Sequence, residues 1–280
     1  MVYITDETID ALIKEDVPYI DLTTTLMEIG NNHGTLEFRV REDGVVACTE
    51  EAARVMGKLG LTVIECVSSG TSVAKGSLIL SGNGAAQNLH MAWKVCLNIL
   101  EYCCGTATQA KALLDNAHSV NPDLEVVVTR KSFPGTKELV IKSAMAGGVL
   151  PHRLGLSETV LVFKQHTVFM GGLMALESRI ATMKKRACEK KVIVEVENLE
   201  DALSMVKAGV DGIQFDKVSP DALTEWVRKI RTVNPHVTLI AAGGITVKNV
   251  DLYATTGVDA VATSSIFHGK PLDIAAKMTV

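Results

Sequence analysis

The fold is decided by VVVTRKSFPGTKELVIKSAMAGGVLPHRLGLSETVLVFKQH, residues 126–166, in which two apolar runs each stop at polar, cationic residues. The first run is Val126–Val128 and the second is Thr159–Phe163. Parallel sheets bind ligands at the carboxyl ends of their strands, so this stretch predicts an anion site on one rim of a sheet. The cationic residues that follow the two runs are Arg130, Lys131, Lys164 and His166, with His152 and Arg153 between the runs.

Short apolar runs separated by helical segments continue beyond this stretch. This alternation is typical of a parallel sheet covered by helices, and it favours a closed or nearly closed β/α barrel over a flat sheet. The expected strands are Val126–Val128, Thr159–Phe163, Val192–Val196, Gly212–Phe215, Thr238–Ala242 and Ala260–Thr263.

The first part of the chain has a different pattern and predicts an α+β region with an antiparallel sheet. Leu36, Phe38 and Val40 alternate with polar residues, as in a half-buried strand. Residues 42–44 are expected to form a hairpin turn, and Thr49 is expected to cap the next helix. Further strands are expected at 61–67 and 77–80.

A long helical pattern follows a break at residues 81–84 and covers 85–102. Gly105 is expected to interrupt it before it resumes over 106–118. Near the N-terminus, Asp21 and the threonines after it indicate a helix cap or an Asx-turn. We place a domain boundary inside the long helical stretch.

Composition limits the classes of function. The chain has 280 residues, is 47% hydrophobic and carries a formal net charge of −4, which suits one large or two smaller globular domains without a nucleic-acid footprint. Its N-terminus lacks the pattern of a signal peptide, and we expect no membrane span. Six cysteines without a CxxC pair argue against zinc and favour a reduced, cytoplasmic setting; adjacent Cys103 and Cys104 are expected to be buried.

The ends of the remaining predicted strands complete the rim. Glu195 lies inside the third run, where a lone carboxylate is costly unless it is paired or functional. Considered one at a time, these residues have ordinary explanations. A lysine at a strand end is most often a solvated surface charge, and a glycine pair most often marks a loop. Together, cations, carboxylates and a Gly/Ser rim suit phosphoribosyl pyrophosphate, which carries a phosphate, a sugar and a pyrophosphate. The other strand-end residues are Asp216, Gly243, Gly244, Ser264 and Ser265.

The stretch TRKSFPGTKELVIKSAMAGGVLPHRLGLSETVL, residues 129–161, resembles the signature of the quinolinate phosphoribosyltransferase family (nicotinate-nucleotide pyrophosphorylase, carboxylating). EDVPYIDLTT, WKVCLNILEYCCGTAT, VEVENL, FDKVSPD, AAGGITVKNV and TGVDAVATSSIFH also have counterparts in order, so the similarity covers nearly the whole chain. In detail it is similar to the ModD branch, pyrophosphorylases associated with molybdenum-transport genes.

The resemblance implies an N-terminal α/β sandwich domain at 1–104, an open parallel β/α barrel at 105–265, and a segment at 266–280 that packs back on the first domain. It implies a pentosyltransferase that uses phosphoribosyl pyrophosphate, Mg²⁺ and a small heterocyclic acceptor, as in NAD biosynthesis. It also implies a homodimer or higher homo-oligomer with shared active sites.

The roles that the resemblance implies are these. Arg130, His152 and Arg153 bind the acceptor carboxylate or pyrophosphate, and Lys131 is a cation at the reacting centre. Glu195 and Asp216 hold ribose and metal and stabilise an oxocarbenium-like transition state. The 5′-phosphate and remaining substrate contacts fall on Gly243, Gly244, Ser264, Ser265, Lys94 and Lys164.

Departures from the family pattern cluster where quinolinate carboxylates would bind. Lys94 stands for an arginine contributed across the dimer, and lysine cannot make the forked contact. Phe163 stands for an acceptor-binding lysine, with Lys164 one place along; Pro151 stands for an asparagine. Ile240-Ala241-Ala242 replaces Glu-Ala-Ser, and Ser264 replaces a glycine. We therefore expect retained donor chemistry and a more apolar acceptor pocket.

Three alternatives stay open. One is genuine quinolinate phosphoribosyltransferase activity with a relaxed site. Another is a non-catalytic nucleotide- or anion-binding regulatory protein, against which the retained Glu195 and Asp216 argue. The third is a Schiff-base barrel enzyme that uses Lys131 or Lys164.

Overall fold

The computed structural model describes residues 2–280, which form two compact units. The first unit contains the chain up to Lys111 together with Ser132–Gly148 and Ile266–Val280, and the second contains Ala112–Lys131 and Val149–Ser265. Helix α4 (Ala86–His118) runs from one unit into the other. The division at 104 and 265 made from the sequence stays a prediction.

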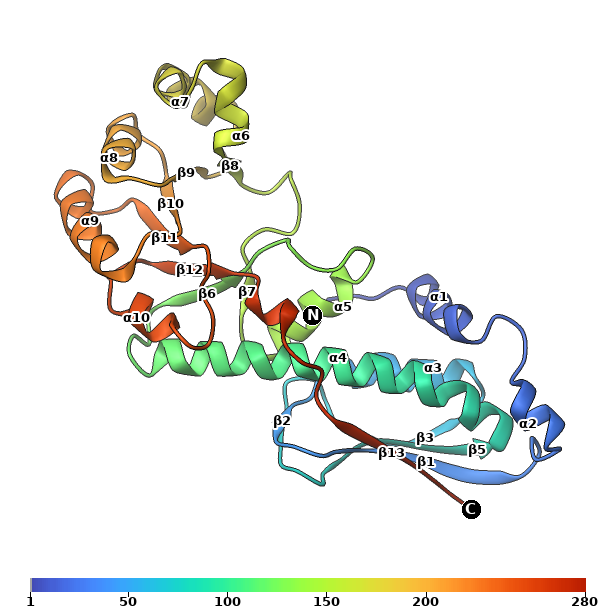
Figure 1. Ribbon diagram of the computed structural model, residues 1–280. Helices are drawn as coiled ribbons and strands as arrows, with labels where there is room; N and C mark the ends of the chain where they lie inside the picture. The colour runs from blue at the N-terminus through green and yellow to red at the C-terminus, as the bar shows by residue number, and fades with distance from the viewer. Residues whose placement is uncertain (1) are drawn as a thin grey trace. The chain divides into compact units, whose positions relative to one another are not determined.

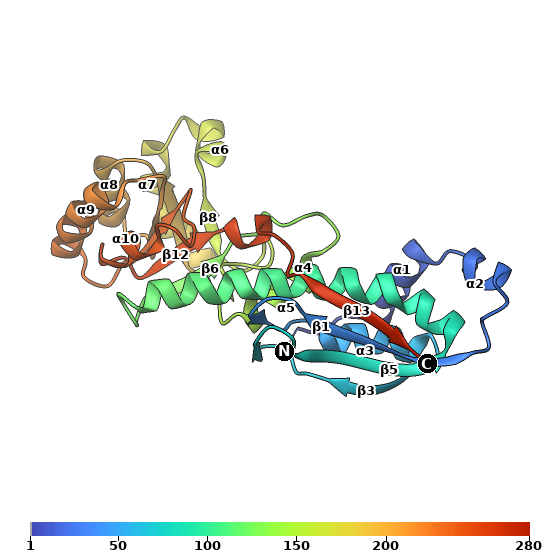
Figure 2. The same ribbon diagram turned by 60° about the horizontal axis from the view of Figure 1, so that its bottom comes forward.

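An antiparallel sheet forms the first unit, with strand order β13-β1-β5-β3 (Figure 2). Leu36, Phe38 and Val40 of β1 are all buried, which confirms the predicted alternation. Apolar residues of α3 and of the first part of α4 pack against this face. The bounds are β1 His33–Val40, β3 Thr62–Cys66, β5 Leu78–Ala85, β13 Ile274–Thr279, α1 Asp6–Asp16, α2 Leu22–Leu26, α3 Thr49–Lys58 and α5 Lys137–Ala146.

Two local predictions in this unit are confirmed. Asp21 caps α2, and its side chain accepts a hydrogen bond from the backbone N–H of Thr24 at 3.2 Å. Cys103 and Cys104 are both buried in the core between α4 and the sheet.

Four other local predictions are wrong, and the fourth, at Gly105, is described in the next paragraph. The turn at 42–44 makes no hairpin with β1, because β2 (Gly44–Val45) pairs with β4 (Ser72–Val73) instead. Residues 81–84 are part of β5 rather than a break. Thr49 is the first residue of α3, which follows Cys48, and its hydroxyl donates to the carbonyl of Val67.

Gly105 does not interrupt the long helix, and α4 is continuous over 33 residues. Its lack of a side chain has a different purpose, since a Cβ there would lie 2.6 Å from the Lys270 carbonyl oxygen and 2.9 Å from Cα of Pro271. The glycine therefore lets the C-terminal segment cross the helix closely on its way to β13.

The second unit is a seven-stranded parallel sheet in the order β7-β6-β12-β11-β10-β9-β8 (Figure 1). It is an open half-barrel, so the predicted fold class is confirmed, and the short edge strand β7 is the one strand of this seven-stranded sheet that the sequence pattern missed. The bounds are β6 Glu125–Val128, β7 Leu150–Pro151, β8 Val160–Val162, β9 Val192–Val196, β10 Gly212–Asp216, β11 Thr238–Ala242 and β12 Ala260–Thr263.

Helices connect these strands, as expected for β/α units. Figure 1 shows α7, α8 and α9 following one another along one side of the sheet. The bounds are α6 Lys164–Thr167, α7 Met174–Arg186, α8 Leu199–Lys207, α9 Pro220–Val233 and α10 Val250–Ala254. Among the described residues, no helix combines the length and the apolar character needed to cross a bilayer.

The two faces of the half-barrel differ in what they contact. Phe215 of β10 packs against Trp226 of α9, with ring centroids 5.9 Å apart. Residues on the other, inner face form a small apolar cluster of their own. That cluster contains Leu161, Ile193, Ile240, Ala242, Ala260 and Ala262, with Val127 and Phe163 packed against it.

A buried ion pair joins α5 to α3 in the first unit. Lys142 Nζ lies 2.6 Å from Glu51 Oε2 and 3.0 Å from Glu50 Oε2. The Glu51 side chain is only 5% exposed and that of Lys142 is 13% exposed. Because both charges are largely removed from water, each depends on the other.

We expect Lys142→Met to lower the free energy of unfolding by roughly 3 kcal/mol, since it leaves the Glu51 carboxylate buried and unpaired. Urea unfolding measures the effect. The control is Lys229→Met, which removes an exposed i,i+4 pair with Glu225 and should cost less than about 0.5 kcal/mol. Equal costs for the two variants would contradict a buried role for Lys142.

Candidate active site

Two guanidinium groups converge at the carboxyl end of the half-barrel. Arg130 follows β6 and Arg153 follows β7, the two neighbouring strands. Burial lowers the pKa of Arg153, and the positive charge of Arg130 lowers it further. Because two positive charges lie close together there, this region favours the binding of an anion.

Two carboxylates lie on β9 and β10, which are neighbours of each other in the sheet. Glu195 is opposite Gln214 in the parallel ladder, and Gln214 Nε2 donates to Glu195 Oε2 at 2.6 Å. Burial raises the pKa of Glu195; the Gln214 hydrogen bond and Lys131 act against this, and Asp216 adds to it. Lys131 and Asp216 therefore both lie close enough to Glu195 to influence its charge. The reacting centre that the sequence predicted from these three residues stays a prediction.

His152 lies beside the same groups. Burial lowers the pKa of His152, Arg153 lowers it further, and a contact with the Gln214 side chain raises it. Its Nε2 atom is buried and makes no well-formed hydrogen bond within residues 2–280. Burial and the charge of Arg153 therefore both disfavour the protonated form of the His152 ring.

An aromatic ring, that of Phe163, occupies the position that the resemblance assigns to an acceptor-binding lysine. The Arg153 guanidinium lies over the Phe163 ring, 5.7 Å from its centroid. Phe163 is itself held by His166, whose ring stacks on it at 5.8 Å and whose Nδ1 accepts from the Phe163 N–H at 2.9 Å. Phe163 also packs against the inner apolar cluster, which includes Ile240 and Ala242. One wall of the site is therefore apolar.

Backbone geometry at the ends of β10 and β11 is unusual. Lys217 and Gly243 both have a positive φ, +57° and +86°, and the Lys217 N–H donates to the Ala242 carbonyl at 2.8 Å. A Cβ on Gly243 would lie 2.6 Å from Asp216 Oδ1. Gly243 is thus the residue that allows Asp216 to sit against the β11 end.

The serine rim follows β12. Ser264 and Ser265 are half-buried, and the Ser265 N–H donates to Thr263 Oγ1 at 3.0 Å. Thr263 Oγ1 in turn donates to the Ile245 carbonyl at 2.6 Å. This network ties the end of β12 to the Gly243-Gly244 loop, so the two predicted phosphate-binding segments are adjacent.

Two predicted residues are not joined to this group. Lys164 is exposed and begins α6 instead of extending the strand. Lys94 belongs to the first unit, is exposed, and places its Nζ 4.5 Å from the centroid of the Trp93 ring.

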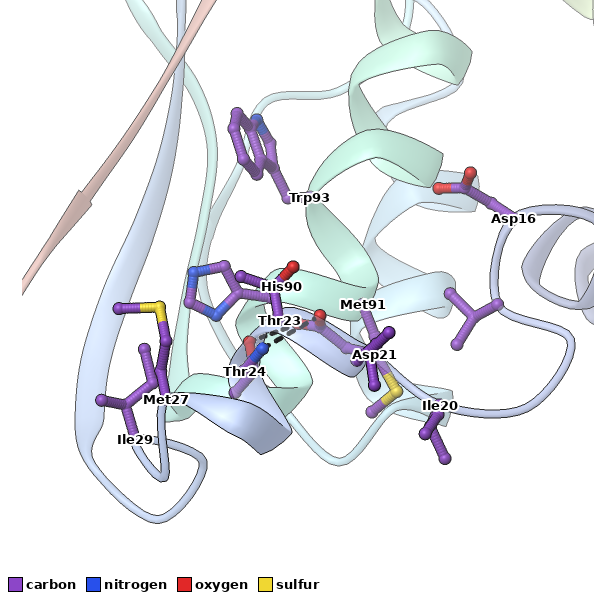
Figure 3. A pocket seen from close by; sticks show the side chains of 12 residues that line it. Asp16, Ile20, Asp21, Thr23, Thr24, Met27, Ile29, His90, Met91 and Trp93 are labelled. Carbon is purple, nitrogen blue, oxygen red and sulfur yellow. Dashed lines mark hydrogen bonds between the residues drawn. The ribbon is translucent and has the colours of Figure 1, made fainter.

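A cavity of about 460 Å³ lies in the first unit, between α2 and the start of α4 (Figure 3). Figure 3 shows the hydrogen bonds from Thr24 to Asp21 at its centre. The Thr24 hydrogen bond holds the pKa of Asp21 below its ordinary value. None of the predicted substrate-binding residues is among the residues that line this cavity.

Sequence reasoning missed Gln214, which is only 6% exposed and donates a hydrogen bond to Glu195. The signal was present, since a lone amide inside an apolar strand is costly for the same reason as a lone carboxylate. It also missed the αL backbone of Lys217, which a residue type does not reveal.

Comparison with known proteins agrees with this geometry. Residues 21–104 match the family model described as the N-terminal domain of quinolinate phosphoribosyl transferase, and residues 106–277 match its C-terminal domain. The chain belongs to the quinolinate phosphoribosyltransferase family. Membership confirms the resemblance seen in the sequence and makes the chain a pentosyltransferase-family enzyme.

Individual members of the family align over nearly the full chain. Pyrophosphorylase ModD from Escherichia coli O157:H7 is 34% identical, covering 99% of this chain and 98% of that protein. Nicotinate-nucleotide pyrophosphorylase (carboxylating) from Mycobacterium leprae is 30% identical, covering 96% and 95%. The crystal structure of nicotinate-nucleotide pyrophosphorylase from Ehrlichia chaffeensis shares the fold, with a TM-score of 0.90, 24% identity and full coverage of both chains.

We expect Gly243→Ala to destabilise the protein by roughly 2–3 kcal/mol, because strain at positive φ adds to a steric clash with Asp216. Gly244→Ala is the matched control. Gly244 also has a positive φ, +74°, but no atom lies within 4 Å of its added Cβ, so it should lose only about 1 kcal/mol. Urea unfolding compares them; equal losses would mean that the close approach to Asp216 is not a constraint.

Proposed function

We propose that this protein transfers phosphoribose from phosphoribosyl pyrophosphate to a nitrogen heterocycle whose binding face is largely apolar, and releases pyrophosphate. The heterocycle nitrogen forms a bond to C1 of the ribose while the C1–O bond to pyrophosphate breaks, and the leaving oxygen takes the electron pair. The observation that carries the acceptor class is the Phe163 ring, which lies against the Arg153 guanidinium and the inner apolar cluster.

The donor side of this proposal uses the charged groups at the strand ends. Arg130 and Lys131 supply positive charge for the pyrophosphate, and the Gly243-Gly244 and Ser264-Ser265 segments supply small residues around the 5′-phosphate. Glu195 and Asp216 face the ribose, where negative charge stabilises a transition state with oxocarbenium character. These roles are those expected from the resemblance.

A divalent cation fits the carboxylate pair. Mg²⁺ is usually held by one or two carboxylates with substrate phosphates, and no cluster of three or more His, Cys, Asp or Glu ligands exists among residues 2–280. Glu195 and Asp216, on adjacent strands, are the residues that would hold it. When bound, Mg²⁺ supplies positive charge against the pyrophosphate oxygens.

The acceptor side has fewer positive charges than a site that binds two carboxylates would need. Arg153 has a neighbouring arginine and an aromatic ring, but Ile240 and Ala242 add no charge to the inner face. We propose that Lys94 completes the site from a second copy of the chain in a homodimer, where its ammonium offers a single point charge. A heterocycle with fewer carboxylates than quinolinate suits this arrangement.

A second candidate is genuine quinolinate phosphoribosyltransferase activity, as in NAD biosynthesis. Retention of Arg130, Arg153 and His152 together favours it, since these three could still bind one carboxylate. A role linked to molybdenum transport is suggested by the name of the ModD relatives alone.

Pyrophosphate release should occur when phosphoribosyl pyrophosphate and Mg²⁺ are supplied with a panel of nitrogen heterocycles. We expect release with a heterocycle other than quinolinate, and Glu195→Ala should reduce that release at least 100-fold because it removes transition-state charge. An exposed-site control, Glu225→Ala, should keep full activity. Release with quinolinate alone would favour the second candidate, and no release with any member of the panel would contradict transfer.

The acceptor pocket has its own test. Phe163→Lys combined with Lys94→Arg should raise kcat/KM for quinolinate at least tenfold, since it restores a cation and a forked donor for carboxylates. Phe163→Leu with Lys94→Arg is the matched control, because it opens the ring position without adding charge. The same gain in both double variants, or none in a folded Lys variant, would contradict the pocket argument.

A further inference from the structure

Lys217 has a backbone conformation that lysine rarely adopts. It directly follows β10, and its φ of +57° lies in the left-handed region. Within residues 2–280, three residues other than glycine have a positive φ, and Lys217 is the one that belongs to the second unit. This conformation costs free energy for a lysine, whereas asparagine and glycine adopt it more readily. Strained residues of this kind cluster at functional sites, which makes the surroundings of Lys217 informative.

Hydrogen bonds hold the strained turn on both sides of the Lys217 side chain. The Lys217 N–H donates to the Ala242 carbonyl at 2.8 Å, at the end of the neighbouring strand β11. The Tyr253 hydroxyl of α10 donates to the Val218 carbonyl at 3.1 Å, and Tyr253 and Val218 are both buried. The surrounding structure therefore imposes the left-handed conformation and fixes the point from which the lysine side chain leaves the backbone.

The stem of the Lys217 side chain lies against Gly243. A Cβ added to Gly243 would lie 2.6 Å from Lys217 Cγ and 2.8 Å from the Lys217 backbone nitrogen. The glycine therefore leaves room for the lysine stem as well as for Asp216. Because the stem starts at Gly243, the ammonium group is within reach of the Gly243-Gly244 loop, one of the two segments predicted to bind a phosphate.

The ammonium group of Lys217 contributes little to the stability of the fold. Its Nζ lies 3.8 Å from Asp216 Oδ2, which is too far for a hydrogen bond, and the Lys217 side chain is 78% exposed. An exposed ion pair at such a distance stabilises a protein weakly. The cost of the strained backbone is therefore not offset by this contact, and the flexible stem leaves the ammonium free to turn toward another anion.

We propose that Lys217 binds the 5′-phosphate of the sugar, with its ammonium group donating to a phosphate oxygen at the Gly243-Gly244 loop. The identity of this ligand rests on the function proposed above. An ammonium group suits a phosphate monoester because it combines a full charge with three donors, and hydrogen bonds between charged groups are the stronger ones. When Lys217 turns to the phosphate it leaves Asp216, whose carboxylate then faces the ribose without a neighbouring cation.

Substitutions at this position separate a binding role from a structural one. Lys217→Asn removes the cation and suits the left-handed backbone, and Lys217→Arg keeps a cation. Lys229→Asn, on α9, is the control for loss of an exposed lysine elsewhere in the second unit. We expect Lys217→Asn to unfold at a urea concentration no lower than that of the unmodified protein, because asparagine relieves the strain. A clear loss of stability in Lys217→Asn would mean that the lysine is structural and would overturn the proposal.

The first readout is the binding of ribose 5-phosphate, measured by isothermal titration calorimetry without an acceptor. Lys217→Asn should raise the Kd about tenfold because one charged hydrogen bond is lost, whereas Lys217→Arg and Lys229→Asn should stay within about twofold of the unmodified protein. Pyrophosphate is the second probe, and its Kd should change less than about twofold in Lys217→Asn, since it lacks the 5′-phosphate. The proposal would be overturned by unchanged ribose 5-phosphate binding in Lys217→Asn, by no binding to the unmodified protein, or by a larger loss for pyrophosphate.

The second readout is steady-state kinetics with the heterocycle that releases pyrophosphate. Lys217→Asn should raise the KM for phosphoribosyl pyrophosphate about tenfold and leave kcat within about twofold, because the 5′-phosphate takes no part in the bond changes and is bound equally in the ground and transition states. A fall in kcat with unchanged KM would overturn the assignment to the 5′-phosphate. Absent transfer in the unmodified protein would contradict the proposed function alone, since the binding of ribose 5-phosphate is measured without transfer.

Discussion

The strict alternation of side chains in a parallel ladder is the constraint on which the site depends. Each strand of the half-barrel sends one residue to the helices and the next to the inner face. In β10 this places Phe215 against Trp226 and leaves Gln214 and Asp216 on the side of Glu195. A slip of one residue would put the charged groups under α9 and the aromatic ring into the site, so the apolar packing of the outer face also fixes the register of the reacting groups.

The order of the strands places the positive and the negative side chains of the site on different parts of the sheet. Arg130 and Arg153 follow the strands at one end of the sheet order, whereas Glu195 and Asp216 belong to strands near the other end. Lys131 bridges the two regions electrostatically, since it lowers the pKa of Glu195 against the effect of burial. A substrate with an anionic leaving group and a sugar that gains positive character in the transition state matches such a gradient.

Much of this arrangement was predictable from the sequence because buried parallel strands are apolar runs with abrupt ends. The residues that follow each apolar run were identified as strand-end residues. Glu195 was identified because burying a lone carboxylate costs free energy. β7 was missed because two residues show no period, and the continuity of α4 was missed because Gly105 is a packing residue that looks like a helix breaker. The contact of Arg153 with Phe163 joins residues from different strands, so no local pattern encodes it.

Pro151 has an effect beyond the acceptor site. β7 is an outer strand of the half-barrel, and His152 N–H bonds inward to the Val128 carbonyl, so the backbone nitrogen of Pro151 faces the open side of the sheet. A proline there offers no donor to an approaching strand, and a two-residue strand gives little length to pair with. Pro151 thus also disfavours edge-to-edge pairing with another sheet at the β7 edge of the open half-barrel.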